Sequence, residues 1–400
     1  MPHSLLRPAL VLGLLSCIGP FAIDMYLPAM PVIGTDLGTS VQAMQGTITA
    51  YFLAFGLAQL IYGPWADQSG RKPPLYAGIA VFCAGTVICA LAASVEILSV
   101  GRFVQGMGAA AMMVVPRAII RDLSTGNDAT RMMAAIMLVI SVSPMLAPLA
   151  GAGLLLITGW RAIFLALLVA AAISFVLLRF AQPETLAAQN RQKFNFVATW
   201  AGTKRLLTNR AFLTLTFLGA FGMASFFVFL ASAAFVYTEH YGLSPTQFSF
   251  AFAVNALSFL GASQFAAPLG LQLGANQVLR LASLGFAVCA GGLLALTLFS
   301  TVGLTTLIIG LALGNACLGM VIPTTMVMAV DDHGDIAGLA SSLGGTLQML
   351  TGGAIIAAMG PFFTADPMPM VAVIALCALM SVGLSRMIGP HQATSATLAE

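Results

Sequence analysis

Charge is scarce in this sequence. Of its 400 residues, 7% are Asp, Glu, Lys or Arg and 59% are apolar, whereas a soluble protein carries roughly 25% charged residues. So few charges cannot cover a surface that faces water, and the composition therefore predicts a protein embedded in a lipid bilayer. The formal net charge of +3 is too small to indicate a nucleic-acid partner.

Motifs for catalysis or cofactor chemistry are also lacking. The six cysteines lie within apolar runs, without CxxC or Cys/His spacing, so we interpret them as small buried hydrophobic residues and expect neither a metal site nor a disulfide framework. No Gly-x-x-x-x-Gly-Lys-Ser/Thr loop is present for a nucleotide. We therefore expect no cofactor and no enzymatic activity.

Long apolar runs take the place of the missing charges. A membrane-spanning helix needs about 20 mostly apolar residues, and twelve segments meet this requirement. They are 8–33, 41–65, 74–94, 97–121, 131–157, 161–182, 211–237, 245–270, 276–299, 302–329, 337–362 and 369–389. The longest polar stretch separates the first six from the last six. We predict an all-α membrane protein with two pseudo-symmetric six-helix bundles, 1–182 and 211–400, joined by a cytoplasmic linker, 183–210.

The basic residues predict the orientation of these spans. With the N-terminus inside, all sixteen Lys and Arg residues except Arg102 and Arg161 fall on the inner side, as the positive-inside rule requires. Both termini, including a short C-terminal tail, are then cytoplasmic. Two halves joined by a basic inner linker are typical of a secondary transporter with its site between the halves. We expect such a chain to act as a monomer.

The loop after the second span carries the most specific motif, which runs from Gly63 through Asp67 to Gly70, Arg71 and Lys72. Gly70 permits a tight turn, and Asp67 can pair with a basic residue across the loop. The spacing resembles the loop signature of the major facilitator superfamily. The resemblance implies that Asp67 and Arg71 form a latch at the inner face. The alternative is a solvated turn with ordinary basic residues.

The fourth span contains an arginine within Gly101–Gly108. An arginine inside a membrane segment is costly and usually has a partner. The stretch resembles the second superfamily signature, Arg-x-x-Gln-Gly, which implies a role for Arg102 in proton transfer. The alternative is that its side chain extends to the lipid headgroups.

The fifth span contains two prolines four residues apart, which bend a helix and free backbone carbonyls. Together with nearby glycines they resemble the antiporter signature of proton-driven exporters, although Ala147 and Ala152 replace two of its glycines. The motif positions here are Pro144, Pro148, Gly151 and Gly153.

The first span, over Phe21–Pro31, and the stretch Arg117–Leu123 resemble the Bcr/CflA branch of drug:proton antiporters, the bicyclomycin- and chloramphenicol-resistance group. This resemblance implies a multi-pass protein of the bacterial inner (plasma) membrane with the major facilitator fold. Such a protein would export small drug-like molecules by alternating access, in exchange for protons.

Asp24 is the only acidic residue well within a predicted span. Proton coupling needs a group that titrates inside the protein, so we predict Asp24, Arg102 and Arg117 as the proton-coupling residues. Arg102 matches Asp24 better in depth, and Arg117 remains a possible partner. Protonation of Asp24 would weaken its attraction to Arg102 and let the halves rock. Alternatively, Asp24 only caps a helix broken before Pro28.

The predicted substrate cavity lies between the halves, with walls of aromatic and uncharged polar residues that suit a small amphipathic ligand. The candidates are Tyr26, Tyr51 and Gln59 in the first half and Phe226, Phe229, Asn255, Asn315 and Gln348 in the second. Two alternatives stay open because fold does not fix function. One is an exporter of a metabolite, sugar or amino acid; the other is a non-transporting receptor, although no segment is large enough for a sensory domain.

Overall fold

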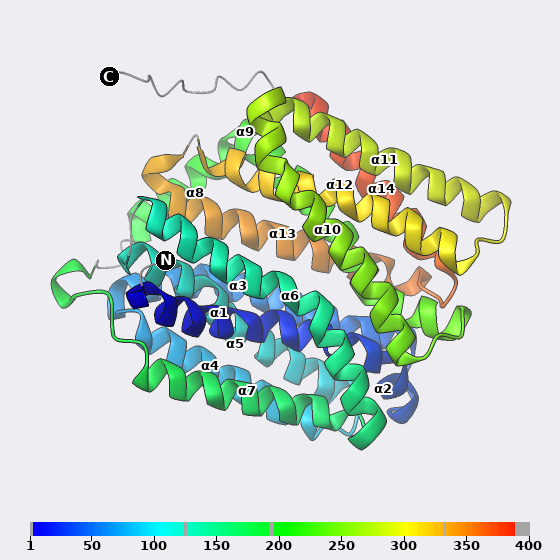
Figure 1. Ribbon diagram of the computed structural model, residues 1–400, viewed down its shortest axis with the longest axis horizontal. Coiled ribbons are helices and arrows are strands. Elements are labelled where there is room, and N and C mark those ends of the chain that lie inside the picture. Colours follow the sequence, from blue (N-terminus) through cyan, green and yellow to red (C-terminus); the bar gives the residue numbers. More distant parts are fainter. Residues whose placement is uncertain (1–2, 124–125, 192–195, 332, 389–400) are drawn as a thin grey trace.

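The structure is a computed structural model that describes residues 3–123, 126–191, 196–331 and 333–388. Within these ranges it is all-α, as predicted. Its first span is α1 (His3–Asp24), followed by η1 (Leu27–Ala29) and α2 (Met30–Asp36). The other spans are α3 (Val41–Ser69), α4 (Lys72–Ala90), α5 (Val95–Leu123), α6 (Gly126–Thr158), α7 (Arg161–Phe180), α9 (Arg210–Phe235), α10 (Pro245–Leu273), α11 (Ala275–Phe299), α12 (Leu304–Asp331), α13 (Ala337–Met359) and α14 (Pro367–Met387) (Figure 1).

Eleven of the spans are long and apolar enough to cross a membrane, counted over the described residues. The twelfth is α6, whose apolar part there is Val142–Thr158. Each predicted span therefore coincides with a helix. The short elements are η2 (Ala188–Asn190), the π-helical turn η3 (Val236–His240), η4 (Gly334–Ile336) and η5 (Gly360–Phe362). The predicted linker contains a helix that we did not expect, α8 (Phe196–Thr208).

The first span differs most from its prediction as one continuous helix over 8–33. Helix α1 ends at Asp24, and the chain passes through η1 before α2 begins. Pro28 and Pro31 explain the break, because proline has no backbone N–H and favours the first turn of a new helix.

The helices form two sets of six with the same internal packing. Helix α3 packs on α5 as α10 packs on α12, and α1 packs on α6 as α9 packs on α13. Between the sets, α3 contacts α13 and α6 contacts α10. These contacts exchange under a two-fold operation that relates the bundles, so the predicted pseudo-symmetric six-helix bundles are confirmed. Figure 1 shows them as a lower and an upper group of roughly parallel helices.

Glycines allow equivalent helices of the two bundles to touch. A Cβ atom on Gly106 of α5 would lie 2.4 Å from the Tyr51 carbonyl oxygen of α3. A Cβ atom on Gly319 of α12 would lie 2.1 Å from the Phe259 carbonyl oxygen of α10. In both bundles a side chain at this position would force the backbones apart.

The bundles also contact each other along α3. Gln45 donates a hydrogen bond to Ser232 at 3.3 Å, and the rings of Phe52 and Phe227 stack with centroids 3.8 Å apart. Nearer the end of α3, the Thr346 hydroxyl donates to the Gly56 carbonyl at 2.8 Å. We call the end of the molecule where α3 and α7 finish and α9 begins the linker end, and the opposite end the far end.

Candidate proton-coupling and substrate site

Asp24 lies at the point where α1 breaks. Its side chain is only 5% exposed, and its Oδ2 atom accepts a hydrogen bond from Ser143 of α6 at 3.3 Å. A buried carboxylate is costly unless a proton or a cation neutralises it. The geometry therefore places an ionisable group where helix α6 can respond to its charge.

Helix α6 presses directly on the break. A Cβ atom on Gly151 would lie 2.2 Å from the Met25 carbonyl oxygen, so only glycine allows this approach. Gly153 has open space where a Cβ would be, and its packing does not require glycine. The predicted antiporter motif, with Pro144 and Pro148 inside the helix, thus connects to α1 through Ser143 at one end and Gly151 at the other.

Arg102 is fully buried within the N-terminal bundle and does not reach the bilayer surface. Its Nη1 atom donates to the Ala22 carbonyl at 2.9 Å and to the Gln105 side chain. Its guanidinium carbon lies 4.6 Å from the ring centroid of Tyr26 and 4.4 Å from that of Tyr51. Two aromatic faces stabilise the buried cation. The Nε and Nη2 atoms have no hydrogen-bond partner among the described residues.

Further hydrogen bonds fix the groups around Arg102. The Tyr26 and Thr47 hydroxyls are 2.7 Å apart, Tyr51 donates to the Gly19 carbonyl at 3.1 Å, and Gln105 donates to Thr86 at 2.9 Å. Tyr26 and Tyr51 are fully buried. In this structure both rings lie against Arg102, and their role in binding the substrate stays a prediction.

The predicted charge pair between Asp24 and an arginine is absent from the described residues. Arg102 binds the carbonyl of Ala22, two residues before Asp24, and Asp24 binds Ser143 instead. Arg117 lies fifteen residues after Arg102 on the same helix, or about 22 Å along its axis. In this structure Arg102 therefore contacts the backbone of α1 and not the Asp24 carboxylate, and the proton-coupling role of these residues stays a prediction.

The loop between α3 and α4 forms a compact charge network at the linker end. Arg71 binds Asp67 through Nη1 and binds both carboxylate oxygens of Asp122, at 2.7 and 3.0 Å. Such a bidentate pair is directional as well as charged. Burial alone would lower the pKa of Arg71, but the hydrogen bonds that it donates to Asp122 and Asp67 raise it above its ordinary value. Gly63 has open space around it and takes no part in the network.

Glu184, which follows α7, completes this network. Its carboxylate accepts hydrogen bonds from the backbone N–H groups of Arg71 at 2.9 Å and of Lys72 at 3.0 Å, at the first turn of α4. Burial alone would raise the pKa of Glu184, but the backbone donors Lys72, Arg71, Leu186 and Thr185 hold it below its ordinary value. The Lys72 ammonium donates to the Gln182 carbonyl at 2.8 Å.

Gly70 is required at this turn for two reasons. Its φ is +98°, a left-handed conformation that glycine adopts without strain. A Cβ atom there would also lie 2.8 Å from a carboxylate oxygen of Glu184. Sequence analysis predicted Asp67 and Arg71 but missed Asp122 and Glu184 as partners. The one feature of the sequence that could have indicated them is that both acidic residues follow the end of a predicted span.

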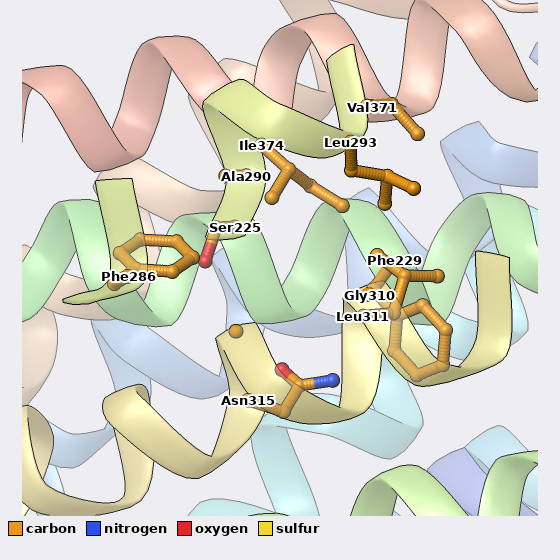
Figure 2. Close-up of a pocket in the computed structure, with 11 residues that line it drawn as sticks. Ser225, Phe229, Phe286, Ala290, Leu293, Gly310, Leu311, Asn315, Val371 and Ile374 are labelled. Atoms are coloured by element: carbon orange, nitrogen blue, oxygen red, sulfur yellow. The ribbon is translucent and has the colours of Figure 1, made fainter. Parts of the chain in front are cut away.

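Four of the predicted substrate residues lie inside the C-terminal bundle. Phe229 and Asn315 line a small cavity between α9, α11, α12 and α14, whose wall is apolar except for Ser225 and Asn315 (Figure 2). The Asn315 amide donates to Asn255 at 3.1 Å. Phe226 stacks on Phe259 with centroids 5.8 Å apart. The structure groups these residues with each other but not with Tyr26 and Tyr51.

The last two predicted substrate residues meet where the bundles face each other. Gln348 lines a hollow between α9, α12 and α13 that also contains Thr216, Thr325 and Ser341. Gln59 of α3 reaches the same place, since a Cβ atom on Gly345 would lie 3.0 Å from its Oε1 atom. The Thr216 hydroxyl is buried without a hydrogen-bond partner among the described residues.

Two bundles related by pseudo-symmetry, with ionisable groups buried in membrane helices, define a secondary transporter. The sequence profile described as Major Facilitator Superfamily matches residues 12–357. The chain belongs to this superfamily and is a multi-pass membrane transporter.

Several known sequences and structures are similar to this chain. It is 32% identical over 354 residues to an uncharacterized MFS-type transporter, YdgK, of Bacillus subtilis, covering 88% of each chain. It is 30% identical to a bicyclomycin resistance protein homolog of Haemophilus influenzae, over 93% of this chain and 94% of that protein. It is also 30% identical to a chloramphenicol resistance protein of Pseudomonas aeruginosa, over 100% and 96% respectively. A crystal structure of a D-xylose-proton symporter shares its fold, with a TM-score of 0.76 at 15% identity over 94% of this chain and 96% of that one.

Proposed function

We propose that this transporter is a proton-coupled antiporter that exports small, uncharged, drug-like molecules from the cytoplasm. The observation that carries the proposal is Asp24, a buried carboxylate at a helix break, bound to Ser143 of the helix that carries the antiporter-like motif. The names of the relatives, which refer to bicyclomycin and chloramphenicol resistance, support drug-like substrates.

The proposed coupling uses the contact between α1 and α6. When Asp24 is protonated, its site is neutral and α1 packs in an apolar environment. When Asp24 loses the proton, the buried charge favours a conformation that lets water or a cation reach it. Because Gly151 holds α6 against Met25, this change moves α6 relative to α1 and so shifts the balance between the two orientations of the bundles. Arg102 positions the break through the Ala22 carbonyl.

The linker end is cytoplasmic in this proposal, and the protein lies in the bacterial inner membrane as a monomer. The excess of Lys and Arg residues in the segments at this end supports the orientation. The network of Asp67, Arg71 and Asp122 then acts as a latch at the cytoplasmic face. The functional units are the bundles 1–182 and 211–400, with 183–210 as the linker between them.

The hollow that contains Gln348 is the proposed entry point for substrate. It offers hydroxyl and amide groups and no charged side chain, and Gln59 adds a polar group from the opposite bundle. Such a lining can orient a neutral ligand by hydrogen bonds while apolar neighbours such as Met326 cover the rest of it. The same lining would also accept an uncharged metabolite or sugar, which keeps a metabolite exporter as the second candidate.

The test compares Asp24→Asn with Asp36→Asn in proteoliposomes. Asp36 is an exposed aspartate of the same span, paired with Arg161 at the far end, and serves as the matched control. With chloramphenicol or bicyclomycin as probes, a pH gradient should drive uptake by the wild-type chain and by Asp36→Asn, but not by Asp24→Asn. Gradient-driven transport by Asp24→Asn at the wild-type rate would overturn the coupling role. Transport of neither probe by any variant would favour the metabolite reading.

A further inference from the structure

Helix α8 of the linker exposes an apolar and basic face. Its opposite face is packed, since Leu206 is fully buried and a Cβ atom on Gly202 would lie 2.7 Å from Leu339 of α13. Yet Trp200 is 61% exposed, and Val197 and Leu207 are exposed as well. A tryptophan with that much surface in water is unfavourable, because its large ring stabilises a protein only when it is covered.

The exposed face follows one stripe of the helix. Val197, Trp200, Lys204 and Leu207 are spaced by three or four residues, so their side chains project from the same side. A stripe of this kind, with a tryptophan and aliphatic residues beside a lysine, is typical of helices that lie in the plane of a membrane surface.

The position of α8 places it at that surface. It ends at Thr208, and the membrane-spanning helix α9 begins at Arg210. Only one residue separates the two helices, and each residue spans at most about 3.5 Å of chain. The end of α8 therefore lies within several ångströms of the start of α9. Helix α8 packs on both α9 and α13, so it is attached to the C-terminal bundle.

Along the chain, the charged residues on either side of α8 and within it are all basic. The sequence contains no acidic residue between Glu184 and Glu239, but it has five basic ones. They are Arg191, Lys193, Lys204, Arg205 and Arg210. Basic residues beside a bilayer attract anionic lipids, by about 1 kcal/mol for each residue near the surface. Tryptophan rings are enriched at the same level of the bilayer.

We propose that α8 is an interfacial helix that binds the headgroups of anionic phospholipids in the leaflet at the linker end. Trp200, Val197 and Leu207 insert among the headgroups and upper acyl chains, and Lys204 binds the lipid phosphate. The bound lipid thereby contacts the helix that connects the linker to α9 and α13. This proposal requires only that the chain spans a membrane, and it is independent of the substrate and of proton coupling.

Trp200 itself can report the contact. Trp65→Phe together with Trp160→Phe leaves Trp200 as the single tryptophan of the chain, which contains three. The protein is reconstituted in nanodiscs of phosphatidylcholine, or of equimolar phosphatidylcholine and phosphatidylglycerol, with a nitroxide near the headgroup or near the end of the acyl chain. We expect strong quenching by the shallow label and weak quenching by the deep one. If the doubly substituted chain does not fold, the difference in emission between wild type and Trp200→Phe gives the same information.

Selectivity for anionic lipid is tested with the nitroxide on either lipid. Labelled phosphatidylglycerol should quench Trp200 more than labelled phosphatidylcholine. Lys204→Gln should reduce this preference about fivefold, the factor that corresponds to about 1 kcal/mol for one basic residue. Arg386→Gln, which removes an exposed basic residue of α14, is the matched control and should leave the preference unchanged. Quenching by aqueous iodide but by neither lipid would overturn the proposal, and equal quenching by both lipids would overturn its anionic selectivity.

Discussion

Arg102 of α5 and Asn315 of α12 each lie four residues before a glycine at which two helices touch, and their chemistry differs. Arg102 lies four residues before Gly106, which contacts the α3 backbone, and Asn315 lies four residues before Gly319, which contacts the α10 backbone. Both side chains are buried. In the N-terminal bundle the position holds a cation between two tyrosine rings, whereas in the C-terminal bundle it holds a neutral amide bonded to Asn255.

The loops that follow α3 and α10 repeat this contrast. Gly70 and Gly274 both adopt positive φ, at +98° and +84°, so the turn between the helices has the same kind of glycine. Gly70 is enclosed by Glu184, but nothing lies within 4 Å of a Cβ atom built on Gly274. The bundles therefore share a backbone design, while the buried and networked charges are concentrated in the N-terminal bundle. We infer that the N-terminal bundle responds to protons and that the C-terminal bundle provides a neutral surface.

Replacing these two buried polar side chains by apolar ones should give the largest difference. Arg102→Met removes the hydrogen bond to Ala22 and frees the α1 break. We expect proton-driven transport to fall about 100-fold, because a displacement of the reacting groups on the order of 1 Å can lower a rate by this factor. Asn315→Leu leaves the Asn255 side-chain oxygen buried without a partner. It should cost about 1–3 kcal/mol of stability but retain proton coupling.

Transport in proteoliposomes and the apparent melting temperature separate these outcomes. If Asn315→Leu abolished the response to a pH gradient while the protein stayed folded, the proposed division of roles between the bundles would be wrong. Retention of coupled transport by Arg102→Met would show that the Ala22 contact is only structural.

Alanine at the two contact glycines should instead give equal effects. Both Gly106→Ala and Gly319→Ala place a Cβ atom within 2.4 Å of a backbone oxygen on the neighbouring helix. Overpacking of this kind costs about 1–3 kcal/mol, and we expect similar decreases in melting temperature. Gly291→Ala, in α11, is the control because its Cβ would have open space, and it should have no destabilising effect. A decrease for only one of the two variants would show that the bundles do not share this contact.

The sequence was sufficient to predict the fold because the length of an apolar run is a local property. The rarity of charge in the spans also identified Asp24 and Arg102, since a single ionisable residue in an apolar run is conspicuous. Their actual partners could not be predicted in the same way. Ser143 and the Ala22 carbonyl are common groups, and only the packing of α6 and α5 against α1 selects them.

The substrate residues were the least predictable part. Tyr26 and Tyr51 were assigned to a cavity because aromatic residues often line one, but the span pattern does not show which helix faces which neighbour. Both rings lie on Arg102 in this structure, and their contact with a substrate stays a prediction. Gln59 and Gln348 do lie near each other, across the interface of α3 and α13.

The smallest predicted effect concerns Glu184, which has no counterpart beside Gly274. The pKa of Glu184 in the folded protein is below its ordinary value of 4.5. Its stabilising contribution is therefore complete above that value and is lost as the pH falls through the lower pKa of the folded state. Glu184→Gln should destabilise the protein by about 0.3–1 kcal/mol at neutral pH, the usual size of a charge effect at a helix N-terminus.

The difference in melting temperature between wild type and Glu184→Gln should be constant from neutral pH down to about pH 5 and should shrink below it, because both forms then carry a neutral side chain. Glu184→Asp keeps the charge but shortens its reach to the N–H groups of Arg71 and Lys72, so it separates charge from geometry. A constant difference between wild type and Glu184→Gln down to the lowest pH at which both remain folded would show that the charge does not stabilise the turn. The contrast between the two glycine loops would then rest on Arg71, Asp67 and Asp122 alone.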